Sequence, residues 1–166
     1  MVKPVVLAMV VADQVYQDKR SGKSVIAGTF TKILFSETEP DGGTRDSQPD
    51  SSDAEDSARE DRGRPAVFMV GSPHIYLALT GVRKDLDLKI RLVDLSDARV
   101  MMDGNIPIRL AEHDPVAIRE FAIPLPRLPI PKGNGQYSVD ILDNGEQLAS
   151  WRIDSVLENH KLNSGA

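Results

Sequence analysis

The sequence is poor in the residues that build reactive or metal-binding sites. It has no cysteine, which excludes a disulfide scaffold, a thiolate zinc site and a cysteine nucleophile. Its three histidines, His74, His113 and His160, lack the spacing of a ligand pair on one strand or helix. There is no Gly-x-Ser-x-Gly motif and no glycine-rich phosphate-binding loop. We therefore assign no catalytic, cofactor-binding or metal-ligating residue, and we expect a protein that is not an enzyme and has no cofactor.

The chain also lacks a basic patch and a long apolar run. Its net charge is −5 and its pI is about 5.2. No cluster of basic residues would neutralise the phosphates of a nucleic acid, so no nucleic-acid partner is expected. No apolar run approaches the roughly 20 residues that cross a bilayer, so no membrane partner is expected. The lack of cysteine is compatible with a reducing compartment, and we expect a cytoplasmic protein.

Aromatic residues make up 5% of the chain, which leaves few rings for a carbohydrate-binding surface. Aspartates lie in or near predicted turns, and calcium takes oxygen ligands of this kind. They are Asp85, Asp87, Asp94, Asp97 and Asp103. Their spacing matches no defined calcium loop, and aspartate is also a common turn residue. Calcium or carbohydrate binding therefore stays an alternative to a role without a small ligand.

The negative charge is concentrated in residues 37–64. This segment holds ten acidic and four basic residues, and its apolar side chains besides proline are Ala54 and Ala58. Such a segment cannot bury enough apolar area to offset the entropy of ordering it. We predict a disordered acidic insertion within a single domain of residues 1–166, with a flexible tail at 158–166. The insertion is either a tolerated surface loop or a partner-binding loop whose serines accept phosphate.

The start of the chain has two interpretations. Val5–Ala12 is continuously apolar, as in a strand that is buried on both faces. Residues 1–12 also resemble a short signal peptide, which would make the protein secreted. We favour the strand, because the polar turn Lys19–Lys23 and a second β-rich run, Val25–Phe35, follow it and predict a hairpin.

The middle of the chain is also predicted to be strands. Leu86–Leu92 alternates apolar and polar residues over seven positions, with Asp87, Lys89 and Arg91 on the polar face. Further extended segments are expected at Val67–Val70, Ile75–Leu79, Val100–Met102 and Ile106–Leu110, and the last two are separated by a turn at residues 103–105. Val116–Leu125 is predicted to be extended or to contain one helical turn. His74 lies beside Pro73 at a strand start and is read as a surface or edge histidine.

The last hairpin is predicted in more detail. Tyr137, Val139 and Ile141 share one face of a strand that leads into a turn at residues 143–145. A simple two-residue loop would place Trp151 on the polar face. We therefore predict a three-residue loop that ends with Gly145 in the left-handed region and pairs Trp151 with Tyr137.

Seven to nine short strands with many turn signals and almost no helical periodicity predict an all-β fold. The expected architecture is an antiparallel β-sandwich of the immunoglobulin-like or C2-like kind. The stretch 124–131 has four prolines, which lack the backbone N–H that donates hydrogen bonds between strands. We expect it to cross one end of the sandwich as a polyproline-like segment. A docking role for this stretch is the alternative.

Both ends of the chain resemble a family of small bacterial proteins of unknown function. The similarity rests on Ala12–Tyr16, Gly22-Lys23, Ile26–Phe30 and Ile33 near the start, and on Gly135–Val139 and Asp143–Gly145 near the end. The resemblance implies that the first strand belongs to the domain, and it implies no activity. The acidic insertion departs from the family pattern, in which a much shorter segment connects the same strands.

Together these observations favour a non-catalytic interaction or scaffold module that binds an unidentified protein partner through an edge strand or a loop. The alternative from another class is a ligand-binding β-sandwich for calcium or carbohydrate. An uncharacterised hydrolase is a distant third.

Overall fold

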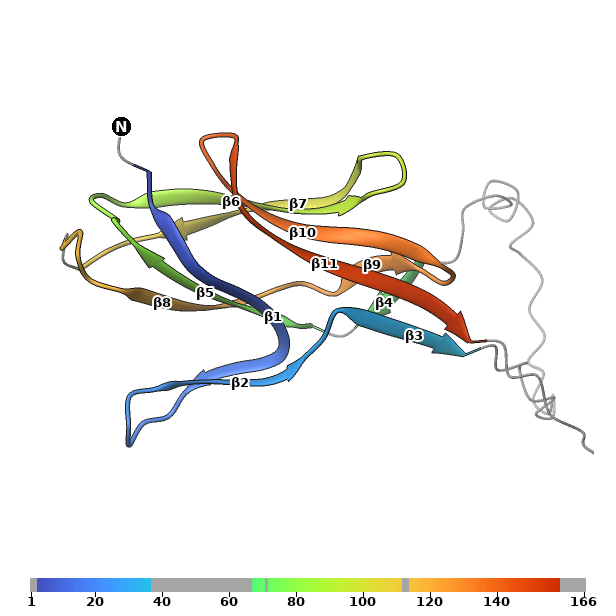
Figure 1. Ribbon diagram of the computed structural model, residues 1–166, viewed down its shortest axis with the longest axis horizontal. Helices are drawn as coiled ribbons and strands as arrows, with labels where there is room; N and C mark the ends of the chain where they lie inside the picture. The colour runs from blue at the N-terminus through green and yellow to red at the C-terminus, as the bar shows by residue number, and fades with distance from the viewer. Residues whose placement is uncertain (1–2, 37–66, 71, 112–113, 159–166) are drawn as a thin grey trace, which may run out of the picture.

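A computed structural model of the chain describes residues 3–36, 67–70, 72–111 and 114–158. These residues form eleven strands and no helix (Figure 1), so none of them belongs to a helix that could span a membrane. The strands are β1 (Val5–Gln17), β2 (Ser24–Thr29), β3 (Lys32–Ser36), β4 (Val67–Val70), β5 (His74–Thr80), β6 (Leu86–Asp94), β7 (Arg99–Ile108), β8 (Arg119–Pro124), β9 (Leu128–Pro131), β10 (Gly135–Asp143) and β11 (Glu146–Glu158). The all-β prediction is confirmed.

Nine of these strands make two sheets that face each other across a shared core. The four-stranded sheet has the order β2-β1-β5-β8, and the five-stranded sheet has the order β3-β11-β10-β6-β7. Strands β4 and β9 form a separate two-stranded ribbon. This arrangement is consistent with a β-sandwich. The two facing sheets hold nine strands, and the β4–β9 ribbon brings the total among the described residues to eleven, which exceeds the seven to nine predicted. The arrangement is also not wholly antiparallel, because β3 runs parallel to β11.

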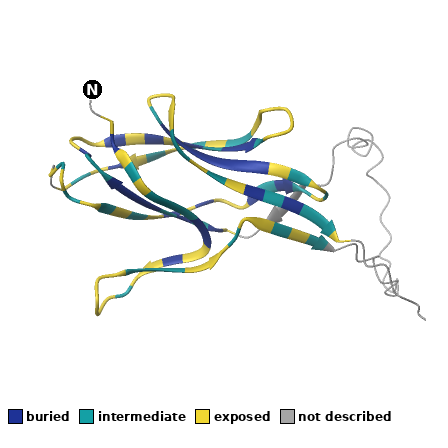
Figure 2. Cartoon of the chain, viewed as in Figure 1, coloured by how far each residue is buried: buried dark blue, intermediate teal, exposed yellow. Residues whose placement is uncertain are grey.

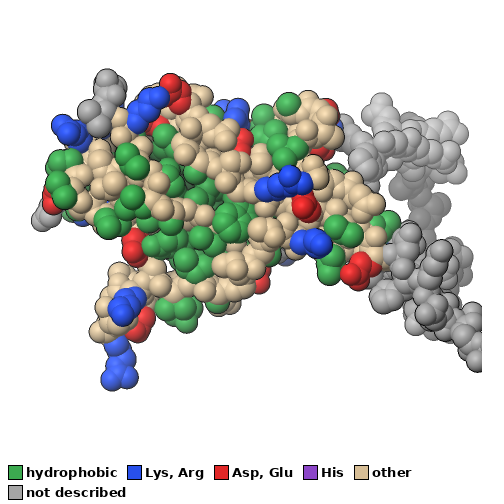
Figure 3. All heavy atoms as spheres, viewed as in Figure 1, with side chains coloured by type: hydrophobic (Ala, Val, Ile, Leu, Met, Phe, Trp, Pro, Cys, Tyr) green, Lys and Arg blue, Asp and Glu red, His purple; other side chains and the backbone are tan. Residues whose placement is uncertain are grey.

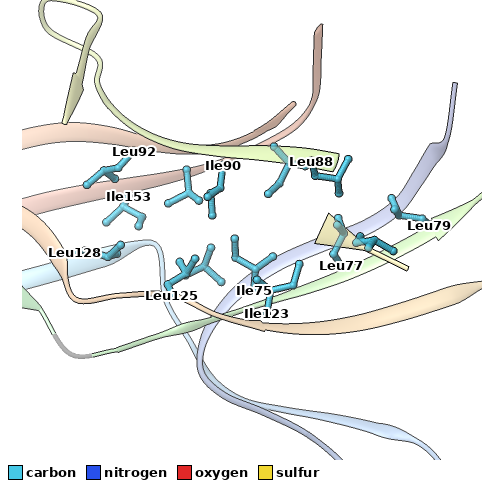
Figure 4. Packing of buried hydrophobic residues seen from close by; sticks show 14 of the residues in the cluster. Ile75, Leu77, Leu79, Leu88, Ile90, Leu92, Ile123, Leu125, Leu128 and Ile153 are labelled. Carbon is cyan, nitrogen blue, oxygen red and sulfur yellow. The ribbon is translucent and has the colours of Figure 1, made fainter. Parts of the chain in front are cut away.

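The core is built from the alternating apolar positions of both sheets. Figure 4 shows Ile75 and Leu77 of β5 and Ile123 of β8 pointing toward Leu88 and Ile90 of β6. All five side chains are buried, whereas exposed positions occupy the turns and the outward positions of the strands (Figure 2). The predicted alternation of β6 is therefore confirmed, because its apolar residues face this core while Asp87 and Lys89 are exposed.

The predicted strand at the start of the chain is confirmed and is longer than expected, but it is not buried on both faces, because Val5 and Leu7 are exposed. Strand β1 pairs with β2 on one side and with β5 on the other. The predicted hairpin forms around a turn in which Gly22 has a φ of +69°. The second run does not stay in one strand, however. It is interrupted at Phe30-Thr31, where the chain passes from the four-stranded to the five-stranded sheet.

Two further predictions are wrong for reasons of pairing. Residues 103–105 do not form a turn, because β7 runs without interruption and pairs with β6 along its length. The proline-rich stretch is not merely a crossover. Leu125, Leu128 and Ile130 are buried in the core, and Leu128–Pro131 forms β9, which is paired with β4. For Val116–Leu125 the extended option is confirmed by β8, and the helical turn is not observed: a β-turn closed by the Ala117 N–H and the Asp114 carbonyl precedes the strand.

The β10–β11 hairpin has a register that was not predicted. Asp143 pairs with Glu146, so the loop has two residues, Asn144 and Gly145, and both have positive φ (49° and 84°). A bulge near Leu142 then shifts the register, so that Trp151 lies opposite Val139 rather than Tyr137. The bulge returns Trp151 to the core side despite the two-residue loop. Trp151 is half-buried there, and its indole Nε1 donates to the Phe30 carbonyl at 2.9 Å.

The predicted acidic insertion, residues 37–64, lies outside the described residues. So does the predicted flexible tail, except for Glu158, which belongs to β11.

Candidate binding site on the outer face of the five-stranded sheet

Strand β10 carries buried polar residues on the side that faces away from the core. Val139 and Ile141 have no exposed surface and face the core. Ser138 and Asp140 alternate with them and therefore point outward, yet they are only 5% and 6% exposed. Burying a carboxylate costs free energy unless neighbouring groups pair with it. The groups around Asp140 therefore make this face a candidate binding site.

Strand pairing places the partners of Asp140 on both sides of it. Arg91 of β6 is its register partner on one side, and Ser150 of β11 is its register partner on the other. The Ser150 hydroxyl donates to Asp140 Oδ1 at 2.8 Å, and Arg91 Nη2 lies 3.5 Å from Oδ2. Ser138 is likewise flanked by Val93 and Arg152. The register thus places one arginine on each side of the buried pair Ser138 and Asp140.

These residues line a surface depression of about 470 Å³, which we call the Arg91 hollow. Its polar residues are Arg91, Ser138, Asp140, Gln147, Ser150 and Arg152. Leu95 of the β6–β7 turn and Val100 of β7 also line it, and each is 46% exposed. The volume lies within the range of small-molecule and side-chain binding sites, and the polar residues sit on three hydrogen-bonded strands that hold them in place.

The hollow is electrostatically mixed, and one of the arginines that line it has an unsatisfied donor. Arg91 Nε is buried and has no hydrogen-bond partner among the described residues, a situation that is rare for buried polar atoms. Arg152 Nε donates to Asp154 at 2.9 Å. Beyond Arg91, Lys89 and Asp103 form an ion pair at 2.7 Å, and the hydrogen bond from Lys89 lowers the pKa of Asp103 below its ordinary value.

A second depression, of about 520 Å³, lies where the β5–β6 loop, the start of the chain and the β10–β11 turn meet. Lys3, Arg83 and Lys84 line it together with Asp143 and Glu146, and Lys3 forms an ion pair with Glu146. Both side chains of that pair are 59% exposed, and exposed ion pairs fix geometry weakly. This larger depression is therefore the less organised of the two.

A third surface feature is apolar. Hydrophobic side chains gather over β1 and toward β11 on the face shown in Figure 3. Val5 and Leu7 of β1 are 54% and 50% exposed. Patches of this kind occur on many proteins, and nothing around this one indicates what would cover it.

The residues considered for calcium do not converge. Asp85 and Asp87 both face Arg109, whereas Asp94 and Asp97 lie at the opposite end of β6, near Arg99. Hydrogen bonds from the Ser96 hydroxyl and backbone N–H lower the pKa of Asp94. Within the described ranges no three histidine, aspartate or glutamate side chains are placed to hold a metal ion. The geometry gives calcium binding no support.

The other residues singled out in the sequence are placed as follows. His74 is half-buried at the start of β5, which is an inner strand rather than an edge, and its Nδ1 lies 3.2 Å from the Asp13 carbonyl. His113 and His160 lie outside the described residues. The sequence assigned no site residue, but Arg91 did appear on the polar face of its strand. Ser138 and Asp140 carry the same signal, because they alternate with Tyr137, Val139 and Ile141.

Comparison with protein-family models and with curated proteins finds no match to this chain. The resemblance to the small bacterial family therefore stays a prediction.

Proposed function

We propose that this chain is a non-catalytic interaction module and that it binds a protein partner at the Arg91 hollow. The observation that carries the proposal is the buried Asp140 on the outward side of β10, held between Arg91 and Ser150. An outward sheet position normally faces water, so a satisfied and buried carboxylate there marks a preorganised polar surface.

The chemistry of the lining residues suits recognition. Guanidinium, hydroxyl and amide groups supply hydrogen bonds, and Leu95 and Val100 supply apolar contact. Polar groups with an apolar side are typical of surfaces that bind side chains of another protein. Among the described residues that line the hollow there is no histidine, so none of them offers the serines an imidazole base.

We keep the immunoglobulin-like or C2-like description of the sandwich as part of this proposal. The two facing sheets of four and five strands support it. Both types commonly serve as non-catalytic modules, although fold alone does not assign function.

The test is a capture experiment with matched variants. Ser150 is exposed and lies in the hollow, so Ser150→Phe fills the hollow without entering the core. Ala122→Phe is the control, because Ala122 is exposed on β8 in the other sheet. Proteins from a lysate of the source cell are captured on each immobilised variant and identified by mass spectrometry.

We expect a partner that is retained by the wild type and by Ala122→Phe and is lost from Ser150→Phe. Ser150→Phe loses the hydrogen bond to Asp140, so its thermal midpoint should be lower than that of the wild type. Far-ultraviolet circular dichroism spectra of the three proteins should agree, which shows that the variants fold. If every partner captured by the wild type is also captured by Ser150→Phe, the hollow is not the binding surface and the proposal is wrong.

A further inference from the structure

We infer that the Arg91 hollow receives the carboxylate of an aspartate or glutamate side chain in an acidic peptide segment of its partner. This inference rests on the proposed function and adds the chemistry of the group that is bound. It follows from the hydrogen-bonding capacity of the hollow, from the register of its arginines and from its apolar side.

The hollow has more donors than acceptors. Each guanidinium carries several N–H donors and no acceptor. Arg91 uses one donor in the 3.5 Å contact with Asp140, and Arg152 uses its Nε for Asp154. Both oxygens of Asp140 are already engaged, by Ser150 and by Arg91. A ligand that satisfies the remaining donors must therefore bring acceptors, and a carboxylate brings two oxygens that match a guanidinium side by side.

The register brings the two arginines within reach of one ligand group. Arg91 on β6 and Arg152 on β11 are separated by one strand, β10, which places the two strands about 10 Å apart. Arg91 is level with Asp140 and Arg152 is level with Ser138. Both arginines line the hollow, one from the strand on each side of β10. Ser138, which lies between them, is one of the lining residues.

Asp140 accounts for the lack of a simple positive patch. The arginines of the hollow are balanced by Asp140 and Asp154, so charge alone does not attract an anion strongly. Asp140 instead holds Arg91 near β10, and the Nε of that arginine has no partner. Selectivity then comes from paired N–H donors rather than from net charge, and lysine is a poor substitute for either arginine.

The apolar side of the hollow favours an apolar residue next to the acidic residue in the partner segment. Leu95 and Val100 are both about half exposed and line the same depression. An apolar residue next to the acidic residue of the partner segment would cover them, which favours an acidic peptide over a free small carboxylate.

The experiment uses ¹⁵N-labelled full-length protein and a pair of matched synthetic peptides. The first is acetyl-Gly-Leu-Glu-Leu-Gly-amide, and the second has glutamine in place of glutamate. A third peptide has glutamine and a free carboxyl terminus. Chemical-shift changes during each titration give the dissociation constant and the residues that are contacted.

We expect the glutamate peptide to shift the amides of Ser138 and Ser150 and the side-chain Nε signals of Arg91 and Arg152. The glutamine peptide should bind at least about fivefold more weakly. Arg152→Lys keeps the charge but loses the planar donor pair, so it should weaken the glutamate peptide by about fivefold. Arg127→Lys is the control, because Arg127 is exposed between β8 and β9 and should leave the affinity unchanged.

Three results would overturn the inference. One is equal binding of the glutamate and glutamine peptides, and another is equal affinity in Arg152→Lys and Arg127→Lys. The third is a preference for the peptide with the free carboxyl terminus, which would assign the hollow to a chain terminus. If the peptides fail while Ser150→Phe still loses its captured partner, the interaction site stands and only its ligand chemistry is wrong. If both experiments fail, the hollow is not a binding site.

Discussion

Two residues in left-handed conformation determine how the last hairpin turns. Asn144 and Gly145 both have positive φ, as in the two-residue turns that match the right-handed twist of paired strands. Asparagine and glycine are the residues that tolerate this conformation best. The expected three-residue loop needed one left-handed residue, whereas the observed turn needs two.

Gly145→Val should therefore lower the free energy of unfolding by about 2 kcal/mol, because a β-branched residue is strained at positive φ. Asn144→Ala should lower it by about 1 kcal/mol, since alanine also resists the left-handed region. Urea denaturation measures both, with the exposed strand residue Gln147→Ala as the control. Equal stability of Gly145→Val and the wild type would show that the turn adopts another conformation.

At the scale of the elements, β11 connects several parts of the fold. It pairs with β10 and β3, and it also contacts the segment between β2 and β3. The Trp151 indole donates to the Phe30 carbonyl at 2.9 Å, and the Asp154 N–H donates to the Thr31 carbonyl at 2.8 Å. These two bonds hold the corner at which the chain changes sheet.

Trp151→Phe should thus lower the free energy of unfolding by about 1–2 kcal/mol, because it removes the indole donor and leaves the Phe30 carbonyl without it. Chemical denaturation followed by far-ultraviolet circular dichroism measures the change. Tyr16→Phe is the control, since Tyr16 is 53% exposed. In the native protein the Trp151 fluorescence should shift to longer wavelength on unfolding. A fully solvated emission in the native state would contradict the observed packing.

At the scale of the whole molecule, we expect the fold not to require the acidic segment, residues 37–64. The described sheets enclose a core of eighteen buried residues drawn from both sheets and from the connections between strands. The composition of residues 37–64 argues that this segment adds little apolar burial.

Replacing residues 37–64 with a short Gly-Ser linker should change the thermal midpoint by less than about 4 °C, because long flexible loops add little closure entropy. Differential scanning calorimetry of the two proteins measures the midpoint. A fall of more than about 8 °C would mean that the segment packs on the domain, and the prediction of a disordered insertion would be wrong.

The sequence alone was enough to place most strands and to assign their faces. The apolar run of β1 and the alternation of β6 predicted both strands, and the same alternation placed Arg91 on the polar face. Turn residues predicted the β1–β2 and β10–β11 hairpins. These features depend on residues that are close in the chain, where side-chain periodicity and φ preferences act directly.

Only the tertiary structure decided which strands became neighbours. Local patterns did not indicate the parallel β3–β11 pair, the uninterrupted β7, the strand in the proline-rich stretch or the bulge near Leu142. The Arg91 hollow depends on the same information, because Arg91, Asp140 and Ser150 come from three strands. Alternation specifies the face on which a side chain lies. The pairing of distant strands is set by how well the whole core packs, and that depends on every strand at once.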